Sequence, residues 1–550
     1  MIQNSRSTRS LETIASESIA GANVPPAACS VSVSGHSLSF TGRNRCLNLL
    51  RRIFSIDLRT LAALRIGTGL LLLIDLYQRA GDLTAHYSDS GLMPRAVVID
   101  KILESPWCIS VHLMSGATAV EALLFAVAAV LAGCLLVGFH TRLCSVGSWF
   151  LLLSLHYRNP MVLQGGDVLL RMLLFWGMFL PLGAKLSVDS LLQPAKPTSR
   201  AMSFFSIATV AMLLQLAFMY WFSVLLKKDP VWFRDYTAVF CALSLEHFVT
   251  PLGKLLLPYH TLLNALTFGT LWLEGLGPVL ALLSGLFRWP IRVTLILMFA
   301  AFHLTMGLCL ELGLFSIICC VAWLAYLPGG FWDSLQRLKH YRSLTARIRV
   351  LNEHLSAKLT RQFRSYPNRG TIQAPFNYTS FLTQIIAAFF LLYVLLWNLR
   401  TINPQRYTRL LPHSADWIGF VSGVAQCWDM FAPAPLKEGG WFVMPAQLQD
   451  GSEVDLWRNG APVNWEKPEL ISAMYKNDRW RKYMVVLAAA VNTDRRLYFA
   501  RYLCNRWNQS HPRAKQILSM QMYLMEEDVL SDYRLSTPRP VLLWTQSSSN

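Results

Sequence analysis

The chain has 550 residues, of which 53% are hydrophobic and only 15% are charged. Soluble domains carry about 25% charged residues, so this composition excludes an ordinary soluble protein and indicates that lipid solvates most of the chain. The net charge of +18 does not indicate nucleic-acid binding, because the basic residues lie in short segments between apolar runs. That arrangement is typical of the cytoplasmic loops of a membrane protein.

The first forty residues are polar, rich in serine and without the apolar core of a signal peptide. We therefore expect residues 1–54 to be a disordered cytoplasmic segment and the first span to direct insertion. The eleven cysteines are scattered, and no C-x-x-C pair occurs. This pattern argues against a metal site or a disulfide framework, although Cys427 and Cys504 could form a single bond.

Apolar stretches of roughly 17 to 25 residues predict membrane-spanning helices, and the chain contains nine candidates. They are residues 61–79, 117–138, 143–157, 168–183, 203–226, 262–285, 293–309, 312–328 and 381–398. The third, fourth, seventh and eighth are short, so we expect these four to be tilted, broken or shielded by neighbours. The fold class predicted for residues 55–400 is an α-helical polytopic bundle of about nine spans.

Basic residues orient these spans in the membrane. A cluster of arginines precedes the first span, namely Arg43, Arg45, Arg51, Arg52 and Arg59, which places the N-terminus in the cytoplasm. When the spans are counted alternately, every even-numbered loop is basic, including the 329–380 loop with its nine Lys or Arg residues. We therefore predict a multi-pass protein of the inner (cytoplasmic) membrane. The segments expected on the outer side are 80–116, 158–167, 227–261 and everything after residue 399.

Residues 401–550 differ in character from the spans, because they mix polar and aromatic residues with short strand-like runs such as Ile517–Met525 and Pro540–Trp544. Asp450-Gly451 between two apolar runs predicts a hairpin turn. The apolar run Met484–Val491 is too short to span a membrane and predicts a core helix or strand. We expect one extracytoplasmic domain here, mixed α/β or mainly β.

Lys227-Lys228-Asp229 stands where the apolar stretch Phe204–Leu226 ends. Two adjacent ammonium groups at the mouth of a span disfavour each other's charged form, and partial burial acts in the same direction. A neutral lysine is a base, so this cluster is a candidate for proton abstraction. The alternative is an ordinary interfacial belt, in which Lys side chains and Trp232 lie at the membrane surface.

Ionisable residues inside spans usually face a bundle interior or a cavity. His303 lies in the seventh span and Glu311 follows it about two helical turns later, so both are candidate cavity residues. A lone, satisfied His303 is the alternative, and Glu274 in the sixth span raises the same question. Asp75 and Arg79 are four residues apart and can form an ion pair on one helix face, with a structural or a functional role.

The segment 156–171 is a polar break between two short spans. Irregular backbone at membrane depth is tolerated only where protein covers it or water lines it. The segment therefore predicts a re-entrant cavity wall, with His156 and Asn159 as cavity candidates. A plain interfacial turn in which Asp167 and Arg171 pair is the alternative.

At these same places the sequence resembles a known family. Phe222–Lys228, followed by Trp232 and Tyr236, is similar to an aromatic-rich helix of the vitamin K-dependent gamma-carboxylases that ends in two lysines. Phe302-His303 followed by Leu314–Ile317 is similar to the Phe-His and Leu-Phe-Ser-Ile elements of that family.

The wider pattern, over roughly residues 55–545, resembles the HTTM (horizontally transferred transmembrane domain) family. The matching residues are Arg65, Asp75, Tyr87–Arg95, Asn159–Asp167, Gln426–Pro433 and Gly440-Trp441, whereas the Leu-rich segment ending in Pro251–Leu256 belongs to the resemblance to the gamma-carboxylases.

The resemblance implies a definite chemistry. In the family, a lysine base deprotonates reduced vitamin K hydroquinone or a related quinol, the anion reacts with oxygen, and the strong base so formed removes a gamma proton from a glutamyl side chain. Carbon dioxide then traps the carbanion, which makes these enzymes carbon–carbon lyases. By motif position Lys228 matches the base, Lys227 is the neighbour that lowers its pKa, and His303 is a cavity residue. Water must be excluded and quinones partition into lipid, so a membrane-embedded site suits both requirements.

The resemblance has one local departure, because Asp229-Pro-Val separates the two lysines from Trp232 and differs from the animal pattern. The leading expectation is a carboxylase-like enzyme acting on a glutamate-containing protein or peptide, with membrane lipids around it and no metal. The alternatives are a quinone oxidase that has lost carboxylation and a non-catalytic membrane protein that binds a lipid or a protein partner. An enclosed Lys228 side chain would favour the enzyme, and a solvent-exposed one the binding protein.

Overall fold

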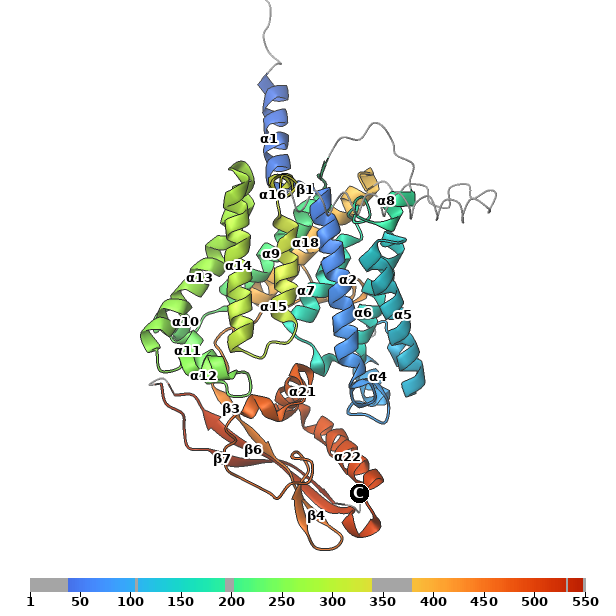
Figure 1. Cartoon of the computed structure of the whole chain (residues 1–550), viewed down its shortest axis with the longest axis vertical. Coiled ribbons are helices and arrows are strands. Elements are labelled where there is room, and N and C mark those ends of the chain that lie inside the picture. Colours follow the sequence, from blue (N-terminus) through green and yellow to red (C-terminus); the bar gives the residue numbers. More distant parts are fainter. Residues whose placement is uncertain (1–37, 104–106, 193–201, 339–377, 531–532, 548–550) are drawn as a thin grey trace, which may run out of the picture. The chain divides into compact units, whose positions relative to one another are not determined.

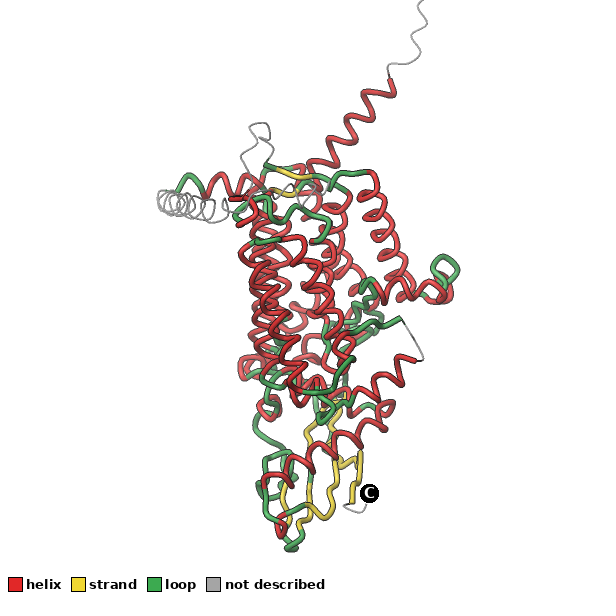
Figure 2. The backbone as a smooth tube through the Cα atoms, turned by 90° about the vertical axis from the view of Figure 1, so that its right-hand side faces the viewer, coloured by secondary structure: helices red, strands yellow, loops and turns green. Residues whose placement is uncertain are grey.

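Long apolar helices form most of residues 58–402 in the computed structural model (Figures 1 and 2). The structure describes the whole chain except residues 1–37, 104–106, 193–201, 339–377, 531–532 and 548–550. Contacts divide the chain into residues 1–48 and residues 49–550, and the fold below is that of the second unit. Much of the predicted disordered segment 1–54 lies outside the described residues, but residues 38–54 form a helix instead, α1 (Leu38–Phe54).

The first half of the chain forms helices at every predicted span. The elements are β1 (Ile56–Asp57), α2 (Leu58–Ala80), α3 (Leu83–Tyr87), α4 (Arg95–Leu103), α5 (Thr118–Val137), α6 (Thr141–Arg158), α7 (Gly165–Gly177), α8 (Val188–Leu192), β2 (Ser203–Phe204) and α9 (Ile207–Leu226). Helix α2 packs on α5, α5 on α6, and α6 on α7. The helix α9 begins with a capping box, because the Ser206 and Thr209 side chains each accept from the other's backbone N–H.

The second group of helices packs around α9. The elements are α10 (Pro230–Phe233), α11 (Ala238–Ser244), α12 (Pro251–Leu256), α13 (His260–Leu283), α14 (Trp289–Cys309), α15 (Phe315–Trp323), α16 (Gly329–Leu335) and α18 (Phe381–Ile402). Helices α13 and α18 both contact α9, and α15 contacts α14 and α7. The buried core of the bundle includes the fully enclosed indoles of Trp176, Trp323 and Trp428.

Six of these helices are long and apolar enough to cross a membrane: α2, α5, α9, α13 with its short continuation to Leu286, α14 and α18. The segment Phe315–Tyr326 bends by 94° into α16, and this pair would make a seventh span. Helices α6 and α7 coincide with the predicted third and fourth spans, but neither is among the six. The count of nine spans therefore stays a prediction, whereas the helical, multi-span character of the bundle is confirmed.

A small sheet and several helices form the C-terminal region, and Figure 1 shows them at one end of the long helices. The elements are α19 (Pro404–Tyr407), α20 (Asp416–Val421), β3 (Glu438–Val443), β4 (Pro445–Leu448), β5 (Glu453–Asp455), α21 (Asp478–Ala488), α22 (Thr493–Ser510), β6 (Ile517–Asp528) and β7 (Arg539–Ser547). The region is thus mixed α and β, one of the two expected forms, and the run at 484–491 belongs mainly to a helix.

Strand β6 is the centre of the five-stranded antiparallel sheet, whose order is β3-β6-β4-β5 with β7 paired to β6. The register sets Trp441 opposite Met525 and Ala446 opposite Met520. The predicted hairpin is confirmed, because β4 and β5 pair across a turn in which Gly451 has φ +83°. Such a left-handed backbone favours glycine.

The core of this C-terminal region also contains residues from the first half of the chain. Leu92, Met93 and Val162 are buried in the same apolar cluster as the sheet residues and Phe499 of α22. These three residues come from the loops that follow α3 and α6, both predicted to face the same side as the C-terminal region. The C-terminal region therefore packs directly on these loops.

Candidate functional site

The two adjacent lysines at the end of α9 lie in different environments. Lys227 is buried, and its Nζ lies 2.7 Å from Glu274 Oε2 on α13 and 2.8 Å from Ser223 Oγ. The same ammonium lies 4.7 Å from the centre of the Trp232 ring, a cation–π distance. Lys228 is exposed, and its Nζ donates to the Ile402 carbonyl at 3.4 Å. The buried amine in this cluster is therefore Lys227, which is paired with a carboxylate.

His303 lies on α14 in a fully buried aromatic cluster. Its Nε2 lies 2.6 Å from the Tyr220 hydroxyl of α9, and Trp323 Nε1 donates to that hydroxyl at 2.8 Å. Because an indole N–H can only donate, the Tyr220 oxygen accepts from Trp323 and its own hydrogen is free for His303 Nε2. The direction of the Tyr220–His303 hydrogen bond depends on the imidazole tautomer, and His303 Nδ1 has no hydrogen-bond partner among the described residues.

One face of α9 connects these two groups. Tyr220, Ser223 and Lys227 are spaced three and four residues apart, so they follow one another along the same side of the helix. Opposite them lie Glu274 of α13 and His303 of α14. We name these five residues the α9 polar row.

The sequence indicated part of this row and missed the rest. Lys227 and His303 were predicted as site residues, and Glu274 was considered only as an ionisable residue inside a span. Tyr220 and Ser223 were not predicted. The 220, 223, 227 spacing of polar groups in an otherwise apolar helix was the signal that could have found them.

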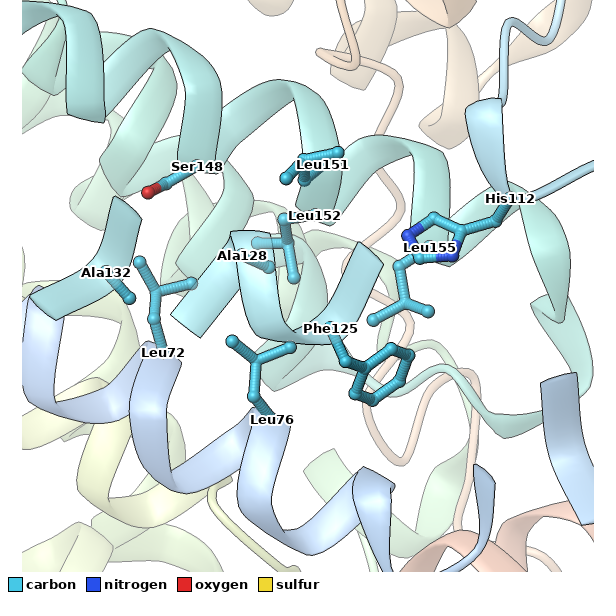
Figure 3. Close-up of a pocket in the computed structure, with 10 residues that line it drawn as sticks. All are labelled: Leu72, Leu76, His112, Phe125, Ala128, Ala132, Ser148, Leu151, Leu152 and Leu155. Atoms are coloured by element: carbon cyan, nitrogen blue, oxygen red, sulfur yellow. The ribbon is translucent and has the colours of Figure 1, made fainter. Parts of the chain in front are cut away.

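In the part of the chain that the structure describes, Lys227, Lys228 and His303 line neither of two cavities that lie near the helices. The first, shown in Figure 3, holds about 20 Å³ between α2, α5 and α6, with His112 at one end and mostly apolar residues around it. A volume of this size holds about one water molecule and not a quinone ring. The second holds about 450 Å³ and is lined by residues 229–241 and parts of the C-terminal region.

Asn159 and His156, the predicted cavity candidates at the end of α6, are both buried. Both atoms of the Asn159 amide form hydrogen bonds to nearby backbone: its Nδ2 donates to the His86 carbonyl, and its Oδ1 accepts from the Met161 N–H. His156 Nδ1 lies 3.3 Å from Arg171 Nη1, and its Nε2 lies 4.0 Å from Asp167 Oδ1. Asn159 therefore shapes the turn, whereas His156 belongs to a buried charged cluster.

That charged cluster links three helices. Arg79 binds Asp75 at 2.7 Å and Asp167 at 2.6 Å, and Arg479 of α21 binds the same two carboxylates at 2.7 and 2.6 Å. All four side chains are less than a tenth exposed, so the two positive charges are balanced by the two negative ones inside the protein. The expected Asp75–Arg79 pair is confirmed.

The structure corrects the alternative in which Asp167 pairs with Arg171. Both arginines of the charged cluster already occupy the Asp167 oxygens, and Arg171 donates to the Ala425 carbonyl at 2.7 Å instead. Asp167 also accepts from the Gln164 N–H at the start of α7. The 156–171 segment is thus a buried turn held by the C-terminal region.

Glu311 does not project into the interior, as a cavity residue would. Its side chain is exposed, while its backbone N–H donates to the Phe248 carbonyl and its carbonyl accepts from Arg481. The intervening backbone explains the difference, because α14 ends at Cys309 and the helical periodicity does not continue to residue 311. Glu311 therefore contributes its backbone to the packing of α21.

The short loop after α2 also binds the start of α21, through Asp82. Asp82 accepts from Lys476, Asn477 and Trp480 at 2.7 to 2.9 Å. His86 lies against the Trp480 ring, with neither ring nitrogen bonded among the described residues. Burial lowers the pKa of His86 to about 4, although the Asp82 carboxylate opposes the shift. This loop is therefore a docking surface for the C-terminal region.

Cysteine and metal chemistry give no further site. Cys427 and Cys504 are both free thiols. Within the described ranges, no group of three His, Cys, Asp or Glu side chains could hold a metal ion.

No protein-family profile, curated protein or solved structure matches the chain.

Proposed function

We propose that the chain is a membrane-embedded enzyme that carries out proton transfer on a lipophilic quinol and couples quinol oxidation to the carboxylation of glutamyl side chains. The α9 polar row is the observation that supports this proposal. Ionisable groups inside membrane helices are costly and usually functional. The row contains an amine and a phenol on one side of α9, which meet a carboxylate of α13 and an imidazole of α14.

The row offers groups that fit a quinol. His303 Nδ1 is buried and unpartnered among the described residues, so it is available for a hydrogen bond with a quinol oxygen. The rings of Phe299, Phe315 and Trp323 surround His303 and Tyr220 with apolar, aromatic surface. A bound hydroquinone would give its electrons to dioxygen and so supply the strong base that removes the glutamyl γ proton, after which carbon dioxide adds to the carbanion. In this proposal His303 orients the ring, and Glu274 holds the Lys227 ammonium in place.

Lys228 is the proposed base by motif position, and its exposure gives the non-catalytic alternative its strongest support. A base that abstracts protons from a membrane-dissolved quinol must reach a water-poor space. Lys228 instead contacts the Ile402 carbonyl at the surface. A membrane protein that binds a lipid or a protein partner would need no enclosed lysine, and a quinone oxidase without carboxylation would share the quinol step alone.

The experiment follows two products at once. The full-length protein in detergent is supplied with vitamin K hydroquinone, labelled bicarbonate and a glutamate-containing peptide, and both quinone epoxide and incorporated label are measured. Epoxide with label supports the carboxylase proposal, and epoxide without label supports the quinone oxidase. Neither product, across several quinones and peptides, leaves the non-catalytic alternative.

Lys228→Ala tests the base directly, because the side chain is exposed and its loss should not unfold the protein. General base catalysis contributes about 10²- to 10⁴-fold, so epoxide formation should fall by that amount. Lys185→Ala, at another exposed lysine, is the matched control and should keep full activity. Full activity in Lys228→Ala would remove Lys228 as the base.

We further propose that the protein lies in the inner membrane with a cytoplasmic N-terminus and an extracytoplasmic C-terminal region. The basic even-numbered loops support this orientation. The Lys228 and Asp229 N–H groups donate to the Pro433 carbonyl, so the end of α9 lies beside the C-terminal region. Reporter fusions after residues 350 and 450 should report opposite sides of the membrane. The basic segment 337–369 lies mostly outside the described residues, so the fusion is its direct test.

A further inference from the structure

The cavity of about 450 Å³ lies beside the end of α9 and outside the α9 polar row. Its charged lining consists of the carboxylates of Asp229 and Asp235 and the ammonium of Lys437. Thr237 and the buried Cys241 add a hydroxyl and a thiol. Ligand sites typically hold 300 to 1,000 Å³ and combine apolar walls with a few polar groups.

Apolar residues complete the walls of this cavity. Val231 and Phe240 come from α10 and α11, and Val529 lies just after β6. All three are buried. The cavity therefore has an apolar side that fits a hydrocarbon chain and a charged side that fits a polar head.

The backbone of one wall is held in a fixed shape. Asp229 Oδ1 accepts from the Val231 N–H, and the Asp235 N–H donates to the Pro230 carbonyl. Tyr236 has φ +53°, a left-handed conformation that is uncommon for a bulky residue. Strained backbone of this kind persists only where the surrounding structure imposes it and is frequent at ligand sites.

The Cys241 thiol in the cavity wall is influenced by both a positive and a negative side chain. Burial raises the pKa of the Cys241 thiol, the Lys437 ammonium opposes this shift, and the Asp229 carboxylate adds to it. Cys241 is therefore within electrostatic reach of a positive and a negative group. A purely anionic ligand would be repelled by the carboxylates of Asp229 and Asp235. An uncharged ligand would displace water from these two carboxylates and from the Lys437 ammonium without offering any of them an ionic partner.

We propose that this cavity binds a small zwitterion, in which a protonated amine meets Asp229 and Asp235 and an anionic oxygen group meets Lys437. The apolar wall at Phe240 accommodates a hydrocarbon chain on the same molecule. This chemistry belongs both to free phosphoamines and to the headgroup of a zwitterionic lipid. The proposal is independent of the quinol chemistry, because the cavity contains none of the residues assigned to it.

The test uses the full chain in detergent and two probes. O-phosphoethanolamine is titrated by calorimetry, with ethanolamine and inorganic phosphate as separate controls, and phosphatidylethanolamine retention is measured by native mass spectrometry against phosphatidylglycerol. Asp235→Asn and Lys437→Gln each remove one charge from an exposed side chain. The matched controls, called the hairpin variants, are Asp450→Asn at the hairpin turn and Lys515→Gln at its ion-pair partner before β6, neither of which lines the cavity.

Binding of either zwitterionic probe should weaken about tenfold or more in both cavity variants, which corresponds to the loss of one charged contact. The hairpin variants should bind like the unmodified protein. Phosphoethanolamine binding would identify a free ligand, and lipid retention alone would identify a headgroup. Three outcomes would overturn the proposal. The first is unchanged binding in both cavity variants, the second is equal binding of ethanolamine or phosphate alone, and the third is no binding of either zwitterionic probe. Circular dichroism and the thermal midpoint without ligand verify that each variant is folded.

Discussion

Arg479 of the C-terminal region holds helices α2 and α7 together through a single side chain. Its guanidinium binds Asp75 of α2 and Asp167 of α7, and it also donates to the Val162 carbonyl. Arginine suits this position because its planar group can donate to several acceptors at once. Without Arg479, two buried carboxylates would share one arginine.

Arg479→Ala should therefore destabilise the protein strongly. Breaking a buried ion pair by removing one partner costs roughly 3–5 kcal/mol, because it leaves an uncompensated charge. Denaturant unfolding in detergent measures the change, and Arg501→Ala on the exposed face of α22 is the matched control. Equal stability of the two variants would show that the buried charged cluster contributes nothing to folding.

His247 gives the fold a pH dependence of known sign. Burial, assisted by the nearby Arg481, lowers the pKa of His247 to about 3. The unfolded chain, with a pKa near 6.5, then binds the proton first as the pH falls, so protonation favours unfolding between pH 6.5 and 3.

The contribution of His247 should appear as a loss of stability below pH 6.5, approaching about 1.4 kcal/mol per pH unit. Unfolding free energies measured at intervals between pH 7.5 and pH 5 determine the slope. His247→Gln should lower the slope by that amount and leave the slope above pH 7 as it is in the unmodified protein. A variant with an unchanged slope would mean that His247 is not the group responsible.

Helix α5 ends at a residue that only glycine fits. Gly138 has φ +75°, and its N–H donates to the carbonyls of Cys134 and Leu135 at the end of the helix. A Cβ atom at this position would collide with the Arg65 guanidinium. Gly133, one turn earlier, has no atom within 4 Å of the position a Cβ would take.

Alanine at these two positions of α5 should have opposite effects. Gly138→Ala forces a left-handed backbone, which costs roughly 1–2 kcal/mol before the collision with Arg65 is counted. Gly133→Ala, inside the helix, should be neutral or stabilise it by up to about 1 kcal/mol. Thermal midpoints in detergent distinguish the two. Equal midpoints would mean that α5 does not end in the left-handed conformation.

At the scale of elements, hydropathy predicts helices well because a span must be long and apolar. Predicted spans 61–79 and 262–285 lie within or almost within α2 and α13. The predicted span 168–183 instead gives a helix that stops at Gly177, shortly before Pro181, which cannot continue a helical ladder. Local composition therefore fixes where most helices occur but not which of them cross the membrane.

The candidate site was harder to predict, because its contacts join distant parts of the chain. Lys227 and Glu274 are 47 residues apart, and Arg479 and Asp75 are 404 apart. Local spacing showed that Lys227 and Lys228 stand at a helix end, but not which one turns inward. That choice follows from the Glu274 carboxylate on α13, which offers the Lys227 ammonium a partner in the interior.

At the scale of the whole unit, the C-terminal region covers charged and apolar residues of the helical part that would otherwise be exposed. Asp82 and the Asp75–Asp167 pair of carboxylates face α21, and Leu92 and Met93 enter the apolar core of the sheet region. Neither part encloses these residues by itself. The two parts therefore behave as one folding unit, which agrees with the contacts that join residues 49–550.

This interdependence predicts complementation between two separate pieces. A chain ending at residue 403 should be protease-sensitive, because its buried carboxylates and apolar loop residues would face water. Co-expression with residues 404–550, directed to the same side of the membrane, should restore resistance through the contacts of α21. The Arg479→Ala form of the second piece should fail to restore it, whereas the Arg501→Ala form should succeed. Limited proteolysis followed by co-purification measures both outcomes, and a first piece that resists protease alone would show that the helical part folds without its C-terminal region.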